Sequence, residues 1–438
     1  MSIYHIRLDN TDNRDEIISS LNLLGTVTEF SEIPKLLEWE GPDSVVKSFS
    51  EISGIRSFEK DEPGKIHLSS QTHDVALGME QGTAQLPIIW HGQRPGDRYY
   101  NSIWDLLRPG QKAVFNYDPT DSVGDGTGVN IYLIDSGIEE THPEFTGRFG
   151  GRLYNPFGGD PPGDHGMAVS TCSLGLTMGV APGATSYDCR AFPSVGSTTV
   201  ARIITAINAA LTEHNNGTAP GVVSCSFGGG GFSDPYDAAV EACVDAGLPL
   251  VAAAGNFGDD LSGLDNHWPA ENPDVIAVGG CDRHFRIHPR SNRYGPVELY
   301  ASYHSWTIAQ QGGDFRGQHS WRGTSFSCPL VAGMVARILT GTTKMTTRAE
   351  VETLTTNLMD NYTAADVIDV DGTPLLSASR LYIPGVTFSG FENATPPTRG
   401  IPESSPINVK AAGVRVLVGS PQNNIAVKKA KTYVIIQE

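Results

Sequence analysis

The chain has 438 residues, with 31 basic and 49 acidic side chains and a formal net charge of −18. This acidity argues against nucleic acid or an anionic membrane surface as a partner and favours solubility. There is no long apolar run, and residues 1–10 lack the basic and apolar regions of a secretory signal, so ordinary export is not expected. A chain of this length is expected to hold more than one domain, one of them large.

Cysteine is sparse for a chain of this length and occurs among apolar or small residues. That setting favours buried thiols over a disulfide framework. The spacing of cysteine and histidine matches no familiar metal site. The cysteines are Cys172, Cys189, Cys225, Cys243, Cys281 and Cys328.

Residues 3–60 alternate between short strand patterns and helical patterns. One helical stripe runs from Ile17 to Leu24 and a second from Val45 to Ile52, each bounded by cap candidates or glycine. The order is β-α-β-β-α-β, which predicts a small ferredoxin-like α+β domain. Its strands are expected at Ile3–Leu8, Thr26–Phe30, Leu36–Trp39 and Ile55–Phe58.

Residues 63–124 form the next segment, which Pro-Gly pairs interrupt repeatedly. A single helical turn is expected at 102–107. Aromatic residues such as Trp90, Tyr99 and Trp104 are frequent here, whereas a disordered linker would contain few. We therefore expect an ordered connecting segment that packs on the large domain.

From residue 125 onward, continuous apolar runs alternate with helical stripes at 200–211 and 239–244, and a further amphipathic helix is expected at 347–358. Such apolar runs are typical of parallel strands that are buried on both faces. The pattern predicts an α/β domain at 125–390 with a mostly parallel sheet and helices on both faces. The expected strands are Val129–Ile134, Ser186–Phe192, Val222–Phe227, Pro249–Ala254 and Val275–Val278.

Two of these strands deliver polar residues to one edge of the sheet. The run from Val129 leads to Asp135, and the run from Pro249 leads to Asn256. Sites in such sheets form beyond the carboxyl ends of the strands. Asp135 is therefore a candidate acid, and the amide of Asn256 is a candidate donor to negative charge that develops on a substrate.

His165 and Ser325 stand at the starts of two predicted helices. His165 leaves a Gly/Pro-rich loop just before a small-residue helix expected at Met167–Leu174, and Ser325 follows a glycine turn and opens a buried apolar helix. Histidine can act as a base near neutral pH. The unpaired N–H groups at a helix N-terminus can stabilise an oxyanion beside a serine nucleophile.

Each of these residues also has an ordinary structural explanation. Ser325 can simply cap a helix, His165 can be a surface loop histidine and Asn256 a turn residue. The glycine run at 228–231 can be a flexible loop. Taken singly, each residue leaves both interpretations open.

Taken together, the blocks around Asp135, His165, Asn256 and Ser325 resemble, in the same order, those of the subtilisin-like serine proteases (subtilases), closest in detail to the proteinase K branch. The resemblance covers residues 125–385. It implies that Asp135, His165 and Ser325 are the acid, base and nucleophile of a catalytic triad, and that Asn256 and the backbone of Ser325 form the oxyanion hole. It also implies substrate binding by Ser226, Phe227, Gly228, Gly229, Ala254 and Gly255.

The sequence departs from the family pattern in two blocks. The histidine block continues as Gly166-Met167-Ala168 where the family usually has Gly-Thr-His, and Phe326 and Cys328 stand where it more often has Met and Thr. These positions lie beyond the proton-transfer atoms. We therefore expect them to change local packing rather than catalysis.

The same resemblance implies a role for residues 1–62, because subtilases carry an N-terminal inhibitory prodomain of the predicted order. The end of that domain is similar to the stretch from Ser53 to Glu59 here. The chain is thus expected to be a zymogen whose own prodomain pairs near Gly228 and is cut between Lys60 and Thr83. The alternative is an unrelated α/β adaptor domain, because fold alone does not establish function.

The expected chemistry requires no cofactor and no metal ion. Asp259, Asp260 and Asp265 cluster after Asn256, and a structural calcium ion there is conceivable. They match no spaced calcium loop, so we expect solvated turn residues. His142 lies near Asp135 in the sequence but outside the histidine block, and we assign it a structural role.

The composition changes after the large domain. Residues 391–407 are rich in proline and small residues and are expected to be a linker. Residues 408–438 hold two Val/Lys-rich patterns, at 409–418 and 427–436, which predict a hairpin or two strands of a sheet shared with another chain. Such tails resemble segments of tailed-phage virion proteins. That likeness implies a virion or oligomer partner for residues 403–438, and a virion-associated or otherwise cytoplasmic protein.

The sequence therefore favours a serine endopeptidase that acts on polypeptides, with a broad, mainly apolar preference for the residue before the cut. The motifs place no acidic residue near Gly228–Gly231 to bind a basic side chain. The alternative is a catalytically silent structural or binding module on the same scaffold. Neither nucleic acid nor a membrane is expected as a partner.

Overall fold

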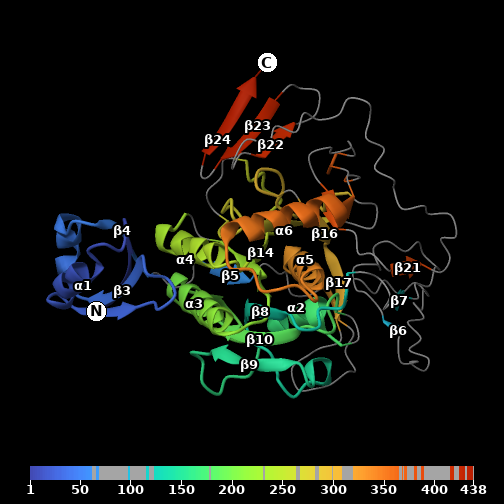
Figure 1. The fold of residues 1–438 in the computed structure, drawn as a ribbon, viewed down its shortest axis with the longest axis horizontal. Helices are drawn as coiled ribbons and strands as arrows, with labels where there is room; N and C mark the ends of the chain where they lie inside the picture. The colour runs from blue at the N-terminus through green and yellow to red at the C-terminus, as the bar shows by residue number, and fades with distance from the viewer. Residues whose placement is uncertain are drawn as a thin grey trace.

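The computed structural model describes the N-terminal region and most of the large α/β region (Figure 1). The predicted linker at 391–407 and the predicted helical turn at 102–107 lie outside the described residues. Those described are 1–61, 66–68, 97–98, 115–117, 123–176, 179–229, 232–262, 267–281, 286–297, 299–307, 319–364, 367, 369–371, 379–381, 386–388, 415–418, 424–429 and 432–437.

Residues 1–61 form the predicted β-α-β-β-α-β arrangement. The sheet is antiparallel, with the strand order β2-β3-β1-β4. The second helical segment is a 3₁₀ helix, in which the hydroxyls of Ser48 and Ser50 donate to carbonyls three residues earlier. The elements are β1 (Ser2–Leu8), α1 (Arg14–Asn22), β2 (Thr26–Glu29), β3 (Leu36–Gly41), η1 (Asp43–Glu51) and β4 (Ile55–Lys60).

This N-terminal unit has a core of its own. The Trp39 ring is fully buried 4.8 Å from the ring of Phe49, and its Nε1 donates to the carbonyl of Leu21 (3.1 Å). Ile6 and Ile17 belong to the same cluster. These apolar contacts are internal to the unit, whereas its residues Phe30, Ile33 and Leu36 belong to the apolar cluster of the large domain.

The large domain is built on the predicted parallel sheet, in the order β19-β20-β16-β15-β14-β12-β8-β10-β9. Every neighbouring pair in it is parallel except β19 with β20. All five predicted strands are present, and the sheet also includes four that the pattern did not predict, namely β9, β16, β19 and β20. The strands are β8 (Asn130–Asp135), β9 (Phe149–Tyr154), β10 (Thr185–Arg190), β12 (Gly221–Cys225), β14 (Leu250–Ala253), β15 (Ile276–Cys281), β16 (Leu299–Ser302), β19 (Thr363–Ala364) and β20 (Ser379–Leu381).

Helices cover both faces of this sheet (Figure 1). Helix α5 packs across β12, β14 and β15 beside α2, whereas α3 and α4 pack together on the other side. None of the helices in the described part of the chain is both long and apolar enough to cross a membrane. The helices are α2 (Asp164–Leu174), α3 (Val200–Asn216), α4 (Asp234–Asp245), α5 (Thr324–Ile338) and α6 (Arg348–Asn361), with the short η3 (Pro143–Phe145).

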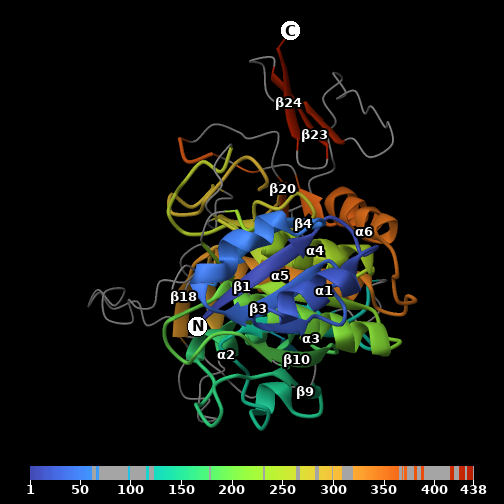
Figure 2. The same cartoon turned by 90° about the vertical axis from the view of Figure 1, so that its left-hand side faces the viewer.

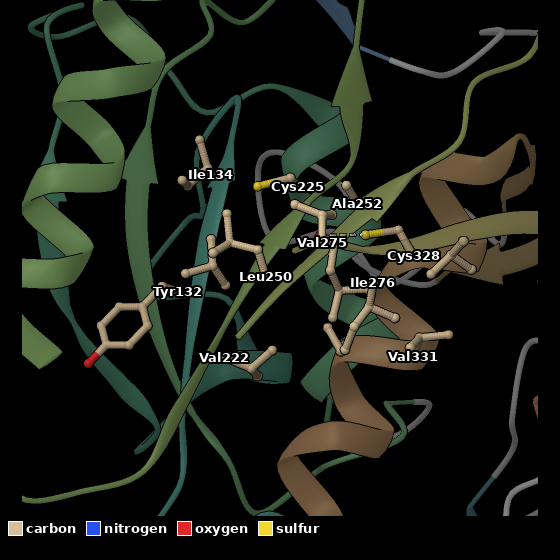
Figure 3. Packing of buried hydrophobic residues seen from close by; sticks show 14 of the residues in the cluster. Tyr132, Ile134, Val222, Cys225, Leu250, Ala252, Val275, Ile276, Cys328 and Val331 are labelled. Carbon is tan, nitrogen blue, oxygen red and sulfur yellow. Dashed lines mark hydrogen bonds between the residues drawn. The ribbon is translucent and has the colours of Figure 1, made fainter. Parts of the chain in front are cut away.

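One part of the core of the large domain lies between the sheet and α5 (Figure 3), and the same cluster extends to buried residues of α3 and α4. There Cys328 of α5 lies against β14, and its thiol donates to the carbonyl of Val251 (3.4 Å). Val331, one helical turn further on, belongs to the same cluster. All six cysteines are free and buried, which confirms the expectation of buried thiols.

Short strands form three further small sheets. The most informative is β11-β5-β13, because β5 belongs to the connecting segment and is antiparallel to both neighbours. What is described of the predicted segment 63–124 is limited to β5, β6, β7 and residues 123–124. The strands are β5 (Ile66–Leu68), β11 (Ser197–Thr198) and β13 (Phe227–Gly228); β17 (His304–Thr307) and β18 (His319–Arg322); and β6 (Asp97–Arg98), β7 (Phe115–Tyr117) and β21 (Val386–Phe388).

The C-terminal tail is a three-stranded antiparallel sheet rather than a hairpin. The prediction of one strand at 427–436 is wrong, because Lys429 pairs with Thr432 and the chain reverses between them. The stretch contains no glycine or proline, the residues that usually mark a turn in a sequence. The strands are β22 (Arg415–Val418), β23 (Asn424–Lys429) and β24 (Thr432–Gln437).

Candidate active site

Three neighbouring strands bring the predicted site residues to one edge of the sheet. Strand β12 lies between β8 and β14, and all three run in the same direction. Asp135 ends β8, Ser226 follows β12, and Asn256 comes three residues after β14. The predicted candidates therefore share the carboxyl edge of the sheet, where sites form in folds of this kind.

Asp135 and His165 form a buried pair. The Nδ1 atom of His165 lies 2.9 and 3.0 Å from the two carboxylate oxygens of Asp135. The two side chains are 5% and 3% exposed. A carboxylate in this position fixes the orientation of the imidazole and leaves the opposite nitrogen, Nε2, for chemistry.

Ser136 holds this pair in place. Its backbone N–H and its hydroxyl both donate to Oδ1 of Asp135 (2.7 and 3.1 Å). The same hydroxyl accepts the N–H of Gly166, next to His165 (2.9 Å). One side chain thus ties the end of β8 to the first turn of α2.

Gly166 allows α2 to approach β8 this closely. A Cβ atom at this position would clash with the backbone carbonyl of Gly137, just beyond the end of the strand. The helix begins at Asp164, three residues earlier than the sequence pattern predicted, so His165 sits in its first turn. This packing sets the distance between His165 and Asp135.

Ser325 lies in the first turn of α5 and is fully buried. Gly323 precedes it with φ 145°, a backbone conformation that favours glycine and turns the chain sharply from β18 into the helix. The Ser325 hydroxyl donates to the carbonyl of Ser226 (3.0 Å). Nε2 of His165 is buried and has no hydrogen-bond partner among the described residues.

The serine is therefore seen in a resting arrangement, in which its hydroxyl is held by Ser226 rather than by His165. Catalytic hydrogen bonds are often long or absent without substrate and form only in the complex. Rotation about the Cα–Cβ bond of Ser325 moves the hydroxyl between staggered positions at little cost. The unpartnered nitrogen of His165 is a suitable acceptor for it.

Asn256 is tied to the start of the same helix. Its Oδ1 accepts the N–H of Thr324 (2.9 Å), and the Thr324 hydroxyl accepts the N–H of Gly255 (3.0 Å). Asn292 supports the same segment from behind, since its Nδ2 donates to the carbonyl of Ala254 (2.9 Å). The side-chain amide of Asn256 and the N–H groups of the first turn of α5 are thereby grouped near Ser325.

The sequence pattern missed three residues that position this site: Ser136, Thr324 and Asn292. The first two directly follow or precede predicted site residues, so a serine or threonine at those positions was a usable signal. Asn292 carried no signal, because it lies 36 residues beyond Asn256 and reaches the site only through the fold.

The departures from the family pattern are packing positions in this structure. The Phe326 ring lies 5.8 Å from the imidazole of His165, and the Met167 sulfur accepts the N–H of Glu139 (3.1 Å). Both side chains are fully buried.

Strand β5 lies between β11 and β13, with His67 opposite Gly228 and Leu68 opposite Phe227. We call the position between β11 and β13 the groove. The predicted substrate-binding residues Ser226, Gly229 and Gly255 flank the same region, whereas residues 230–231 lie outside the described residues.

The acidic cluster after Asn256 makes contacts within its own loop. The backbone N–H of Asp259 donates to Oδ1 of Asn292 (3.1 Å), and Oδ1 of Asp260 accepts the N–H of Ser262 (2.8 Å). Asp265 lies outside the described residues. Within the described part of the chain, no group of three or more His, Cys, Asp or Glu side chains could hold a metal ion.

His142 has the structural role predicted for it. Its Nδ1 accepts the N–H of Glu144 (3.2 Å) and so caps η3. Burial lowers the pKa of this imidazole.

The N-terminal unit contacts the large domain at α3 and α4 (Figure 2). Arg7 of β1 is buried and donates to the carboxylates of Asp234, Asp237 and Glu241 on α4 (2.6, 3.0 and 2.5 Å). Glu59 accepts the N–H of Asp234 at the start of α4 (2.9 Å).

A second helix start is capped in the same way. Asp61 accepts the N–H of Ala201 in the first turn of α3 (3.1 Å). Carboxylates are stabilised at helix N-termini, where unpaired N–H groups and the helix dipole meet. The interface therefore combines charged and helix-capping contacts with apolar ones, since Phe30, Ile33 and Leu36 join the apolar cluster of the large domain.

Comparison with known proteins supports this geometry. The model of the subtilase family (peptidase S8) matches residues 126–373, more than half of the chain. Proteinase R from Parengyodontium album is 32% identical over 247 residues, which cover 55% of this chain and 61% of that protein. Subtilisin-like protease 1 from Arthroderma gypseum is 31% identical over 242 residues, covering 54% of this chain and 48% of that protein.

These alignments span about half to three fifths of the relatives' own length. A solved crystal structure of a cold adapted subtilisin-like serine proteinase is 28% identical, with a TM-score of 0.53. It covers 65% of this chain and 98% of the solved chain. The family match, the parallel sheet and the grouping of Asp135, His165 and Ser325 agree, and the chain belongs to the subtilase family.

Proposed function

We propose that this protein is a serine endopeptidase that hydrolyses polypeptides through Asp135, His165 and Ser325. The observation that carries the proposal is the buried Asp135–His165 pair, whose outer nitrogen has no partner among the described residues and lies at the same strand edge as Ser325. A carboxylate bound to the inner nitrogen of a histidine, with the outer nitrogen left without a partner, is the arrangement that a general base for a serine requires.

In the proposed reaction, the Ser325 hydroxyl attacks the carbonyl carbon of a peptide bond while Nε2 of His165 takes its proton. Asp135 holds the Nδ1–H and stabilises the imidazolium that forms. The amide of Asn256 and the backbone N–H of Ser325 receive the oxyanion. His165 then gives the proton to the leaving amine, and water releases the acyl group by the reverse route. These steps use protein groups alone and need no cofactor.

We also propose that residues 1–62 act as an inhibitory prodomain. Strand β5 follows this unit directly and pairs with both sides of the groove, in the antiparallel manner expected of a bound peptide. The contacts of Arg7, Glu59 and Asp61 with the two helices support the same arrangement. While β5 stays in the groove, other polypeptides cannot bind there.

The register of β5 also predicts a processing site. Leu68 pairs with Phe227, so a chain continuing one step further falls opposite Ser226, whose carbonyl accepts from the Ser325 hydroxyl. Residue 69 itself lies outside the described residues, and the bond is inferred by counting. We propose the Ser69–Ser70 bond, within the expected interval 60–83, and mass spectrometry of the processed chain tests it.

We propose that residues 403–438 form an assembly module, joining an oligomer or a virion. Among the described residues, β22 and β24 each pair on one side only, which leaves two strand edges for pairing with another chain. Lys428 and Lys429 make this tail basic in an acidic protein. The proposed location, virion or cytoplasm, rests on the sequence expectation alone.

Labelling with a fluorophosphonate tests the enzymatic proposal, because it reacts with an activated serine whatever the substrate. Label is expected on Ser325 in the parent chain or after release of residues 1–62, and none is expected in Ser325→Ala. If Ser325 never takes up label in either form of folded protein, the silent scaffold becomes the better explanation.

A further inference from the structure

His267 is a buried polar side chain that the proposed mechanism does not use. It is 2% exposed, and its Nε2 has no hydrogen-bond partner among the described residues. Burial lowers the pKa of this imidazole to about 4, so the ring is neutral near pH 7. A buried nitrogen without a protein partner is available to bond a water, a ligand or a substrate group.

The unpartnered nitrogen lies between the two segments that flank the substrate groove. A Cβ atom placed on Gly228, in β13, would clash with Nε2 of His267, and so would one placed on Gly255, just after β14. Both glycines therefore let the ring sit directly between the two backbones. Neither position tolerates a side chain while His267 is there.

This place is next to the reacting groups. Gly228 lies two residues from Ser226, which holds the Ser325 hydroxyl, and Gly255 donates to the Thr324 side chain beside it. In the register proposed above, a peptide that pairs with β13 as β5 does has the residue before the cut opposite Ser226. The side chain of that residue then lies beside Gly228 and Gly255, between which Nε2 of His267 stands.

Aromatic rings lie beside His267 and its neighbour Trp268. The ring of Phe257 lies 6.1 Å from that of His267, and the ring of Phe232 lies 5.1 Å from that of Trp268. Phe257 is 74% and Phe232 44% exposed, although both are large apolar residues. The surroundings of the His267 ring therefore include exposed apolar rings.

We propose that His267 is the floor of the pocket for the residue before the cleaved bond and selects a short, uncharged polar side chain there: serine, threonine or asparagine. The proposal rests on the endopeptidase function proposed above, and it replaces the broad apolar preference expected from the glycine run.

Three physical effects lead to this selection. An apolar side chain would cover Nε2 without bonding it, whereas a hydroxyl or an amide can satisfy it. A carboxylate would be buried beside a neutral ring and would not be neutralised. A long side chain would collide with the ring. Ser69, the residue before the proposed processing site, is a serine and so belongs to the class of side chains that the pocket is proposed to select.

A peptide series with one variable residue before the cut tests the proposal on the processed protein. Serine should exceed alanine, and asparagine should exceed both leucine and aspartate, by about tenfold or more in kcat/KM, as expected for one buried hydrogen bond. Phenylalanine should be cleaved more slowly than any of the three selected residues. Equal or faster cleavage after leucine or phenylalanine would overturn the proposal.

Two variants of His267 test the effect of the ring's size and the effect of its hydrogen bond separately. His267→Leu keeps nearly the same volume without the nitrogen, so the serine and asparagine preferences should vanish while phenylalanine stays poor. His267→Gly opens the floor, so phenylalanine should improve by about tenfold or more. Unchanged preferences in folded His267→Leu would contradict the proposal. If the variants do not fold, the peptide preferences of the parent protein decide whether the proposal holds.

Fluorophosphonate labelling distinguishes this proposal from the one on which it rests. If Ser325 takes up label but the peptide series prefers apolar residues, only the role of His267 is wrong. If Ser325 takes up no label, the endopeptidase function fails and the role of His267 fails with it.

Discussion

The two folded units of this chain, residues 1–61 and the large α/β domain, use charge in opposite ways. In the large domain, the Asp135–His165 pair is buried at a strand edge and directed at a serine. In the N-terminal unit, the buried Arg7 faces outward from its sheet and finds its carboxylate partners on α4 of the other unit.

The difference distinguishes contacts that persist when the two units separate from contacts that are broken. Each unit has an apolar cluster, and Phe30, Ile33 and Leu36 of the N-terminal unit also join the cluster of the large domain. The other contacts between the units include charged groups and helix starts, which water can solvate again after separation. Removing one partner of a buried ion pair leaves an uncompensated charge, which typically costs about 3–5 kcal/mol. The N-terminal unit is thus held firmly but can be released as a whole.

The largest expected effect is on the catalytic side. Ser325→Ala should lower turnover by about 10⁶-fold, the magnitude known for the corresponding change in subtilisin. The same variant should remain as a full-length, unprocessed chain, because the nucleophile is missing. Peptide hydrolysis and gel mobility measure the two outcomes. A variant that cleaves peptides at the parent rate would show that Ser325 is not the nucleophile.

Asn256→Ala should have the next largest effect, because it removes one donor to the oxyanion and leaves the nucleophile in place. Turnover should fall by about 10²- to 10³-fold, as for the oxyanion-hole asparagine of subtilisin, with little change in KM. Asn256 also accepts the N–H of Thr324, so folding needs a check by thermal unfolding. A loss confined to KM would place Asn256 in substrate binding instead.

Arg7→Ala tests the charged interface. It leaves Asp234 and Asp237 buried without their cation, so the N-terminal unit should bind more weakly, by about 10²- to 10³-fold, and Ser325 in the unprocessed chain should label faster. The matched control is Arg14→Ala, whose partner Glu29 lies in the same unit and is half exposed. An exposed pair contributes little, so this control should label at the parent rate.

If Arg7→Ala and Arg14→Ala label alike, the buried ion cluster does not hold the N-terminal unit over the groove. The contacts of β5 with β11 and β13 would then carry the inhibition, and disrupting that strand would be the informative change.

The smallest expected effect on hydrolysis comes from the tail. Deleting residues 403–438 should leave peptide hydrolysis near the parent rate, because the family match ends at residue 373. The deletion should instead change the oligomeric state or particle incorporation, measured by light scattering and copurification. A soluble, folded deletion variant that loses Ser325 labelling would assign the tail to the catalytic domain.

The sequence by itself determined the parts that local patterns encode. Continuous apolar runs identified five parallel strands, since a strand buried on both faces needs apolar residues throughout. Alternating short elements identified the β-α-β-β-α-β unit. The candidate residues Asp135, His165, Asn256 and Ser325 could be named because each stands where a predicted strand or helix starts or ends. The direction of parallel strands grouped Asp135 with Asn256, and the family resemblance added His165 and Ser325 to them.

Only the tertiary structure decided what depends on distant contacts. Ser136 joins residues 30 apart in the sequence, and Asn292 reaches the segment at Ala254 from 38 residues away. No local pattern showed that His267 lies between Gly228 and Gly255, or that β5 lies between β11 and β13. The division of 427–436 into two strands was hidden for the same reason. Such contacts depend on strand order and register, and these are set by how apolar faces pack together rather than by the residues next to them in the chain.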